Sequence, residues 1–442
     1  MRRAMPLAVL LAVSSIVAAL AVTAPVALAQ APAAGLAPPI HPVPPVPSIV
    51  RAELERRLRA GVDATTWDDG GDLSRFAYLH ATEIFPAAII ARGGPIRTLP
   101  ERLRPEIGRY PLDDDEKRRT LERFIDDELD GFVILHRGAV VYERYPRMRP
   151  DERHLSFSVS KAFVGAALAI LEDRGRIDLS KSIAAYVPRL KGTAWEAASV
   201  RDLADMAAGM EGAESSTAAY SDPKHKHYLM EAALGWQPRT PDMPESVRKG
   251  DSFAFVATLA RVVPPGTQRA YASLQTHVLA EAIEHVTGQR LADVLGDLLW
   301  SRAGAEGDAA ILVNERGEPI AHGGICLRLR DLARFGLLFT ATGAKDARPV
   351  IAPAILKRFD TTGRPELLRK GHPEWIHHAN YQWDAVGTKG ELTKGGFGGQ
   401  LLYIDRERDV VVAYFGTNTT LDKEAPPLPL RTLLARYFDA AN

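Results

Sequence analysis

The sequence predicts an α/β protein of the α+β kind, with one antiparallel sheet built from both chain ends, flanked by helices, around a large helical insertion. Residues 131–145 (GFVILHRGAVVYERY) contain two β-rich runs that meet at Arg137-Gly138, which is typical of a hairpin. Residues 398–416 (GGQLLYIDRERDVVVAYFG) repeat this pattern around a polar turn. Between the hairpins most segments have helical spacing, so we expect a mostly helical subdomain over about residues 159–340.

Apolar residues recur at helical spacing in eight segments of the chain. This spacing predicts helices over residues 49–60, 114–129, 159–174, 199–208, 274–286, 290–303, 328–340 and 427–440. Residues 72–94 (DLSRFAYLHATEIFPAAIIARGG) form a mixed apolar stretch that follows neither a helical nor a strand period.

The composition is that of a globular protein without a strongly charged partner. Of 442 residues, 46% are hydrophobic and 25% are charged, and 55 Lys and Arg residues balance 55 Asp and Glu residues. This balance gives no electrostatic reason to expect nucleic acid or an anionic membrane, so we expect a small-molecule partner. Cys326 is the single cysteine, which excludes an intrachain disulfide and predicts a buried thiol.

The N-terminus has the pattern of an export signal. Two arginines follow Met1, residues 6–28 are almost wholly apolar, and residues 27–29 (ALA) form a small-x-small cleavage site. We predict a signal peptide over residues 1–29, cleaved after Ala29, and therefore an exported protein, periplasmic or secreted, without a membrane contact after cleavage. An uncleaved anchor is the alternative, because the apolar run approaches spanning length.

Three segments are expected after the signal. Residues 30–48 are rich in proline and alanine, which predicts a linker without helix or strand. Residues 49–130 form an N-terminal extension, and residues 131–442 form the main domain. The oligomeric state is not fixed by these patterns.

Ser158 opens an amphipathic helix, and Lys161 lies one turn later. Side chains at i and i+3 on a helix lie about 5–6 Å apart at Cβ, which brings the lysine amine within reach of the serine hydroxyl. Burial at a helix N-terminus lowers the pKa of a lysine and helps to deprotonate the serine. The pair is a candidate Ser-x-x-Lys nucleophile site, with an N-cap serine and a solvated lysine as the alternative.

The same spacing occurs in residues 221–224 (SDPK) and 246–249 (SVRK). A proline interrupts the first, the second ends in a polar segment, and neither opens an apolar helical run. Only Ser158 has the sequence context of a nucleophile.

Tyr271 follows a Pro-Gly turn and precedes an apolar helix, where a rigid loop can direct a phenol into a cleft. Beside Lys161 it would lose its proton easily and act as a base; a half-buried core tyrosine is the alternative. Residues 394–399 (KGGFGG) approach a strand, where glycines allow another backbone or a ligand to come close. A simple hairpin turn is the alternative there.

These three segments, in this order, resemble the signature of the serine β-lactamase and penicillin-binding-protein superfamily. That signature is Ser-x-x-Lys, then Tyr-x-Asn or Tyr-x-Ser, then Lys/His-x-Gly on a strand. The chain looks most like the class C-related branch that includes 6-aminohexanoate-dimer hydrolases and family VIII-type esterases. The resemblance runs from about residue 74 to the C-terminus, through HLSFSVSK, GGICLRLRDLARFG and GGFGGQLLYID among other stretches.

The resemblance implies a role for each candidate residue. Ser158 is the nucleophile, Lys161 the proton acceptor and Tyr271 the general acid/base, and the backbone N–H groups of Ser158 and Phe397 form the oxyanion hole. The implied substrate-binding residues are Lys394, Gly395, Gly396, Ser273 and Tyr220. We therefore expect an exported serine hydrolase that forms an acyl-enzyme with an amide or carboxylic ester, without metal or organic cofactor.

Two departures from the signature argue against efficient β-lactam turnover. Ser273 stands where class C β-lactamases have asparagine, and Gly395 lacks the hydroxyl of Lys-Thr-Gly. Lys394 keeps a cation that can receive a substrate carboxylate.

The alternative functions are a D-Ala-D-Ala carboxypeptidase or β-lactamase, and a non-catalytic cell-wall-binding module of the same fold. Whether Lys161 or Tyr271 is the immediate base stays open.

Other polar clusters are assigned to the surface. Lysines interleave Asp222, His225 and His227, which predicts a solvated loop rather than a metal site. His377 and His378 are also expected at the surface. No Gly-x-Ser-x-Gly elbow occurs, which excludes the α/β-hydrolase arrangement.

Overall fold

The computed structural model describes residues 48–63, 65–112, 117–418 and 428–439. Residues 53–442 form one compact unit, which contains every site discussed below. The expected signal peptide and nearly all of the expected linker lie outside the described residues. Within the described ranges, no helix combines the length and the apolar character that a membrane span requires.

The helical elements are numerous and mostly short. The α-helices are α1 (Ser48–Gly61), α2 (Gly71–Leu79), α3 (Ala81–Ile84), α4 (Leu121–Glu128), α5 (Ser160–Asp173), α6 (Val200–Ala204), α7 (Ala218–Ser221), α8 (Lys226–Ala233), α9 (Glu245–Arg248), α10 (Ser252–Ala257), α11 (Ser273–Thr287), α12 (Leu291–Leu295), α13 (Ser301–Ala303), α14 (Leu329–Leu337), α15 (Ala341–Ala344), α16 (Pro353–Thr361) and α17 (Leu430–Phe438). Tighter or wider turns are η1 (Pro105–Arg109), η2 (Phe157–Val159), η3 (Ile183–Ala185), η4 (Pro188–Leu190), η5 (Ala194–Ala197), η6 (Gly296–Trp300) and η7 (Pro365–Leu367).

The strands fall into two sheets. They are β1 (Ala87–Ile90), β2 (Leu129–His136), β3 (Ala139–Arg144), β4 (His154–Leu155), β5 (Ala309–Leu312), β6 (Ile325–Leu327), β7 (Ile376–His378), β8 (Ala385–Gly387), β9 (Leu392–Gly396), β10 (Gln400–Asp405) and β11 (Val410–Gly416).

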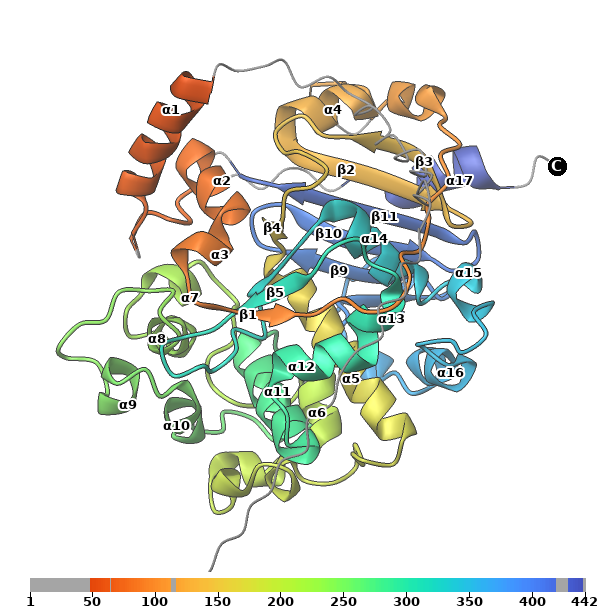
Figure 1. Cartoon of the computed structure of the whole chain (residues 1–442). Helices are drawn as coiled ribbons and strands as arrows, with labels where there is room; N and C mark the ends of the chain where they lie inside the picture. The colour runs from red at the N-terminus through yellow and green to blue at the C-terminus, as the bar shows by residue number, and fades with distance from the viewer. Residues whose placement is uncertain (1–47, 64, 113–116, 419–427, 440–442) are drawn as a thin grey trace, which may run out of the picture. The chain divides into compact units, whose positions relative to one another are not determined.

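The larger sheet joins the two ends of the chain, as expected. Its seven antiparallel strands have the order β3-β2-β11-β10-β9-β8-β7 (Figure 1). The first hairpin supplies β2 and β3 and the last supplies β10 and β11, and β11 pairs with β2 over almost its whole length. The helices between the two hairpins form the large insertion, so the predicted α+β architecture is confirmed.

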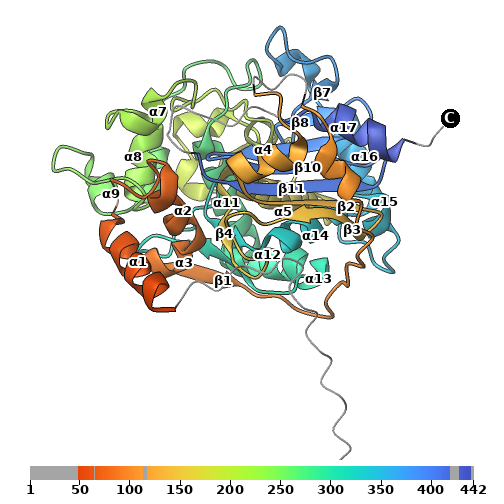
Figure 2. The same ribbon diagram turned by 90° about the horizontal axis from the view of Figure 1, so that it is seen from above.

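Alternating side chains of this sheet serve two cores. Phe132 and Ile134 of β2 belong to a core with residues of α4 and α17, whereas Val133 and Leu135, on the opposite face, belong to the main core with residues of α5, α11 and α14. Figure 2 shows α4 and α17 on one side of the sheet and α5 and α14 on the other. Each fully buried side chain of this size contributes about 1.5–3 kcal/mol, so this alternation fixes the strand register.

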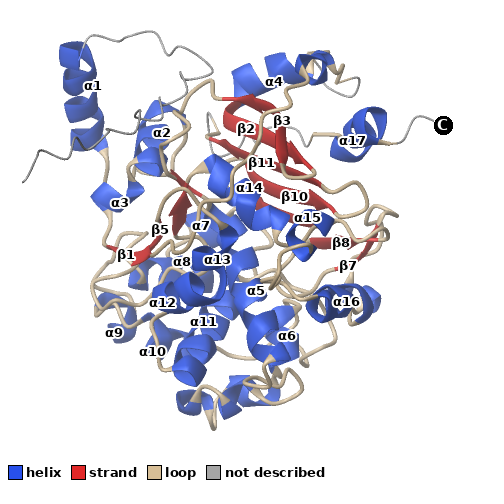
Figure 3. Ribbon diagram, turned by 45° about the vertical axis from the view of Figure 1, so that its right-hand side comes forward, coloured by secondary structure: helices blue, strands red, loops and turns tan. Residues whose placement is uncertain are grey.

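A second, four-stranded sheet was not expected from the sequence. Its order is β1-β5-β6-β4, with antiparallel pairing throughout. Figure 3 shows β1 and β5 apart from the strands of the larger sheet. The strands are two to four residues long, too short for a period to show in the sequence. Cys326 lies on β6 as a free, buried thiol, as predicted.

The helices that matter for the site match the predicted segments. α5 and α11 lie where helices were expected, and the segment 290–303 is divided into α12, η6 and α13. The predicted helix 199–208 ends early, at Ala204, because Met206 takes a left-handed backbone conformation with φ 59°.

Candidate active site

Ser158 lies in η2, directly before α5, in a turn that is fixed from two sides. Phe157 has φ 44°, an uncommon and strained conformation for a residue other than glycine. The N–H and hydroxyl of Ser156 both donate to the Ile325 carbonyl, at 2.9 and 2.8 Å, and the Ile325 N–H donates to Ser160 Oγ at 3.0 Å. The turn that carries Ser158 is therefore anchored to β6.

Lys161 contacts the Ser158 hydroxyl. Its Nζ donates to Ser158 Oγ at 2.8 Å and to the His322 carbonyl at 2.9 Å, and its side chain is fully buried. The pKa of Lys161 is lowered to about 7, chiefly by burial; the ammonium of Lys394 contributes to this decrease, whereas Glu214 and two other carboxylates oppose it. Near neutral pH much of this amine is unprotonated and can accept a proton.

Tyr271 lies beside both lysines. Lys394 Nζ donates to the phenol oxygen at 3.2 Å, and Lys161 Nζ and Lys394 Nζ lie 5.0 and 4.7 Å from the ring centroid. Burial raises the pKa of Tyr271 well above its usual value, and the carboxylate of Asp384 adds to this, while the Ser158 hydroxyl opposes it. The expectation that Tyr271 loses its proton easily is therefore wrong: in the free site the phenol keeps its proton.

The loop that carries Tyr271 is held by its own backbone. The Glu214 N–H donates to the Tyr271 carbonyl at 2.8 Å, and the Ala270 N–H donates to the Met206 carbonyl at 2.7 Å. The Gln275 side chain donates to the Ala270 carbonyl at 3.0 Å. The sequence interpretation of a rigid loop before a helix agrees with this geometry.

Lys394, Gly395 and Gly396 are the last residues of β9, next to the nucleophile turn. Lys394 is fully buried, and its Nζ lies 2.6 Å from Asp384 Oδ1; the Gly395 N–H donates to Asp384 Oδ2 at 3.0 Å. The charge of Lys394 is thus compensated, and it does not present the unpaired cation expected for a substrate carboxylate. A Cβ on Gly396 would lie 2.8 Å from the Ser156 carbonyl, so this glycine permits a close backbone approach.

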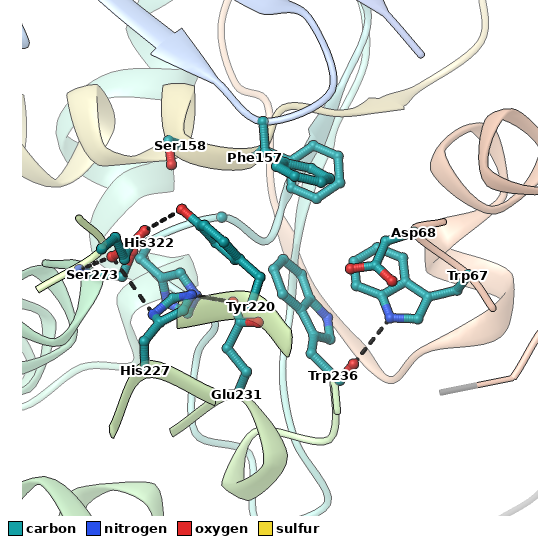
Figure 4. A pocket seen from close by; sticks show the side chains of 13 residues that line it. Trp67, Asp68, Phe157, Ser158, Tyr220, His227, Glu231, Trp236, Ser273 and His322 are labelled. Atoms are coloured by element: carbon teal, nitrogen blue, oxygen red, sulfur yellow. Dashed lines mark hydrogen bonds and ion pairs between the residues drawn. The ribbon is translucent and has the colours of Figure 1, made fainter. Parts of the chain in front are cut away.

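Ser158 opens onto a pocket (Figure 4). The pocket is lined by Trp67, Asp68, Phe157, Ser158, Glu214, Tyr220, His227, Glu231, Trp236, Ser273, His322, Gly323 and Phe397. Four of the sequence candidates, Ser158, Tyr220, Ser273 and Phe397, therefore share one cavity. The other candidates, Lys161, Tyr271, Lys394, Gly395 and Gly396, are not among the lining residues.

A chain of hydrogen-bonded and charged polar groups, most of them buried, lines part of the pocket. Glu214 accepts from the Tyr220 hydroxyl at 2.8 Å and from the Ser273 N–H at 2.5 Å. His227 lies 3.6 Å from Glu214 and 3.3 Å from Glu231, and His322 lies 3.3 Å from Glu231. Burial opposes protonation of His227, but the two carboxylates outweigh it and raise its pKa above the usual value.

Two surface assignments are corrected by the structure. Asp222 is exposed and His225 partly exposed, but His227 is buried, because it lies on the inner face of α8. Likewise His377 is exposed, whereas His378 is buried and lies 2.7 Å from a backbone carbonyl. A charged sequence neighbourhood does not decide which way one side chain of a helix or strand points.

Several residues of the site gave no signal in the sequence. Asp384 pairs with Lys394, Glu214 accepts from the Tyr220 hydroxyl, and Trp67, Asp68 and Trp236 line the pocket. None belongs to a short motif, and each meets its partners only through tertiary folding. His322 directly precedes the GGICLRLRDLARFG stretch, which carried part of the resemblance.

This fold and site are those of a serine hydrolase with the β-lactamase architecture. Residues 121–436 match the family model described as Beta-lactamase, and the chain belongs to this family of hydrolytic enzymes. A 6-aminohexanoate-dimer hydrolase of Paenarthrobacter ureafaciens is 31% identical over 345 residues, covering 77% of this chain and 84% of that protein.

Solved structures show the same architecture. A structure from Bacillus anthracis, assigned as a 6-aminohexanoate-dimer hydrolase, has 25% identity and a TM-score of 0.73, covering 85% of this chain and 95% of its own. A family VIII carboxylesterase has 16% identity and a TM-score of 0.51, covering 72% and 94%. The second likeness concerns the fold alone.

Proposed function

We propose that this protein is an exported amidase or carboxylesterase that works through an acyl-enzyme on Ser158. The observation that carries the proposal is the 2.8 Å contact between Lys161 Nζ and Ser158 Oγ at the pocket wall. A hydroxyl next to a neutral, buried amine is an activated nucleophile. The family membership and the 6-aminohexanoate-dimer hydrolase relative support hydrolysis of a small amide or ester.

Acylation begins when Ser158 Oγ attacks the substrate carbonyl carbon and its proton passes to Lys161 Nζ. The N–H groups of Ser158 and Phe397 stabilise the oxyanion of the tetrahedral intermediate. Tyr271 gives its proton to the leaving nitrogen or oxygen as the carbonyl–leaving-group bond breaks, and it regains a proton from the Lys161 ammonium. The products of this half-reaction are an ester on Ser158 and a free amine or alcohol.

Deacylation repeats these steps with water as the nucleophile. Water gives a proton to the neutral Lys161 amine as its oxygen attacks the ester carbonyl. Ser158 Oγ then leaves and takes up a proton through Tyr271 and Lys161. The carboxylic acid product dissociates and the starting protonation state is restored.

Substitution of the nucleophile tests this proposal. We expect Ser158→Ala to lower hydrolysis of p-nitrophenyl butyrate and of the linear 6-aminohexanoate dimer by about 10³-fold or more, as for other activated nucleophiles. Ser246→Ala is the matched control, because Ser246 has the same Ser-x-x-Lys spacing outside the pocket; it should keep activity within about twofold. Mass spectrometry should find the acyl adduct on the peptide that contains Ser158. Full activity of Ser158→Ala would refute the assignment.

Export is tested separately. Expression of the full chain in a Gram-negative host, followed by fractionation and N-terminal sequencing, should give a periplasmic protein that begins at Gln30. Retention in the membrane with residues 1–29 intact would contradict the predicted cleavage.

Slow or absent labelling by a fluorescent penicillin is expected, since Ser273 and Gly395 depart from the β-lactamase signature.

A further inference from the structure

One buried glutamine ties the turn that carries Phe397 to strand β11. Gln400 is the first residue of β10, which lies between β9 and β11, and its side chain is buried. Its Nε2 donates to the Phe397 carbonyl at 3.1 Å and to the Gly416 carbonyl at 2.7 Å. The Gly416 N–H donates to Gln400 Oε1 at 3.2 Å. Both hydrogens and the oxygen of this amide are therefore used.

These three bonds permit only one orientation of the Gln400 amide. With oxygen and nitrogen exchanged, the oxygen would face two carbonyls and the NH₂ group would face the Gly416 N–H. Glutamate, methionine and leucine cannot replace the amide here, because none of them has two N–H donors. Since buried carbonyls need hydrogen-bond partners, the position favours glutamine.

The turn that contains Phe397 is not fixed by its own residues. Phe397, Gly398 and Gly399 connect β9 to β10, and the two glycines have φ 78° and 96°. Glycine restricts the backbone less than any other residue, so other contacts must hold the turn. Gly396, on one side of Phe397, pairs with Gln400 in the ladder of β9 and β10. On the other side, the Gln400 amide holds the Phe397 carbonyl.

The position of the Phe397 backbone matters because its N–H is one of the two donors assigned to the oxyanion hole. Such a donor acts only when it lies about 2.7–3.1 Å from the position that the oxyanion takes. Phe397 lines the pocket together with Ser158, whereas Gln400 is not among the lining residues. Gln400 can therefore influence the reaction only through Phe397.

We propose that Gln400 is a positioning residue whose amide holds the Phe397 peptide so that its N–H reaches the oxyanion. The proposal rests on the hydrolase function above and extends it to a residue outside the pocket lining. An oxyanion exists in the tetrahedral state and not in the bound substrate. The loss of Gln400 should therefore weaken binding of the tetrahedral state more than binding of the ground state.

Two substitutions of Gln400 test this role. Gln400→Met has a similar length and no donor, and we expect it to lower kcat/KM for p-nitrophenyl butyrate by about 10–10²-fold. Gln400→Glu keeps the acceptor and, when protonated, one donor. Its loss relative to the wild type should be smaller at pH 6 than at pH 8, because an ionised carboxylate would face the two carbonyls.

Two inhibitors separate positioning from a loss of folded protein. Ser158 Oγ can bond to the boron of phenylboronic acid, which places a boron oxygen where the oxyanion forms, whereas toluene has the same ring and forms no adduct. In Gln400→Met, we expect the Ki of phenylboronic acid to rise by about tenfold or more and the Ki of toluene to change less than about twofold. Unfolded protein lowers the concentration of active enzyme and changes neither Ki.

Gln382→Met is the matched control. Gln382 is buried like Gln400, and its amide donates to the carbonyls of Leu203 and Ala204. Gln382 is not among the lining residues of the pocket, and its carbonyl partners lie in a different part of the chain from Phe397. This variant should lose stability in thermal unfolding but keep kcat/KM and the Ki of phenylboronic acid within about threefold of the wild type.

The outcomes separate this proposal from the hydrolase function. If kcat/KM or the Ki of phenylboronic acid stays within about twofold in Gln400→Met, the role of Gln400 is refuted while Ser158-dependent hydrolysis stands. An equal rise of both Ki values also refutes it, because the whole pocket has then changed. Wild-type activity of Ser158→Ala would end the hydrolase mechanism itself. If Gln400→Met does not fold, Gln400→Glu at pH 8 serves for the same comparison.

Discussion

At the scale of single residues, the site pairs two buried groups whose pKa values move in opposite directions. Burial lowers the pKa of Lys161 to about 7 and raises that of Tyr271 well above its usual value. Desolvation disfavours the charged form of each, so the amine tends to be neutral and the phenol protonated. This difference favours Lys161 as the first base and Tyr271 as the acid, a choice that the sequence leaves open.

This assignment predicts a pH profile. Lys161 accepts the serine proton only when neutral, so kcat/KM should rise with pH and level off above about 7. The substrate should be an uncharged ester. The pKa of Asp68 is also about 7, so the Asp68→Asn variant is the control. If Lys161 sets the midpoint of the profile, this variant should show the same midpoint. Lys161→Arg, which stays charged, should be inactive at every pH.

A lower but still measurable rate in Tyr271→Phe, with its midpoint unchanged, would support the division of roles. A midpoint that shifts in Tyr271→Phe, together with activity that is retained in Lys161→Arg, would reverse the assignment. The measurement is steady-state hydrolysis of p-nitrophenyl butyrate between pH 5 and 9, corrected for spontaneous hydrolysis.

Residues joined by local spacing could be predicted, and residues joined by tertiary folding could not. Ser158 and Lys161 lie on one helical turn, so their contact follows from helix geometry. Asp384, directly before β8, reaches Lys394 of β9, and Asp68 reaches the pocket from far outside the motif segments. No spacing in the sequence encodes either approach.

At the scale of elements, β9 approaches the turn that carries Ser158 so closely that position 396 has room only for glycine. A Cβ on Gly396 would meet the Ser156 carbonyl at 2.8 Å and the Gln400 Cβ at 2.9 Å, below the contact distances that carbon atoms tolerate. A Cβ on Gly395, one residue earlier, would have no atom within 3.8 Å. The spacing between β9 and Ser158 therefore depends on one specific glycine.

We predict that Gly396→Ala lowers kcat/KM by about 10²-fold, because a displacement of about 1 Å at a catalytic group costs that much. Gly395→Ala, the adjacent control, should stay within about threefold of the wild type. Circular dichroism and thermal unfolding would show whether Gly396→Ala is folded. Equal activity of the two variants would show that the close approach has no catalytic consequence.

The long elements of the fold could be predicted from the sequence, whereas the short ones could not. The two hairpins and the helices α5 and α11 extend over enough residues for a period to appear. Strands β4 and β6 pair over only two residues, yet they fix the turn before Ser158. Such short strands are defined by their partners rather than by their own composition.

At the scale of the whole molecule, Asp130 joins the two sheets. It lies on β2 with its side chain fully buried, and it contacts Arg75 of α2 at 2.8 Å, His154 of β4 at 3.3 Å and the Thr417 hydroxyl at 2.6 Å. Although burial opposes ionisation, His154 and the other partners lower its pKa below the usual value. One carboxylate therefore links α2, the second sheet and the ends of β2 and β11.

Asp130→Asn should lower the free energy of unfolding by about 3–5 kcal/mol, because it leaves the partly buried guanidinium groups of Arg75 and Arg147 without their counter-charge. Asp126→Asn is the surface control: Asp126 pairs with Arg144 at a partly exposed position, and its loss should cost about 1 kcal/mol or less. Urea denaturation at pH 7 compares the two variants with the wild type.

The sign of the pH effect follows from the lowered pKa of Asp130. Its contribution is complete above the unfolded value of 3.8 and is lost as the pH falls below it toward the folded value. The difference between wild type and Asp130→Asn should therefore shrink in acid. A difference that grows below pH 4 would contradict this role.

The wall formed by Trp67 and Asp68 lies outside residues 121–436, the part of the chain that matches the family, whereas Ser158, Lys161 and Tyr271 all lie inside it. Part of the pocket wall is thus encoded apart from the candidate catalytic residues. Mutagenesis confined to Trp67 and Asp68 changes the shape and charge of the pocket while Ser158, Lys161 and Tyr271 stay in place.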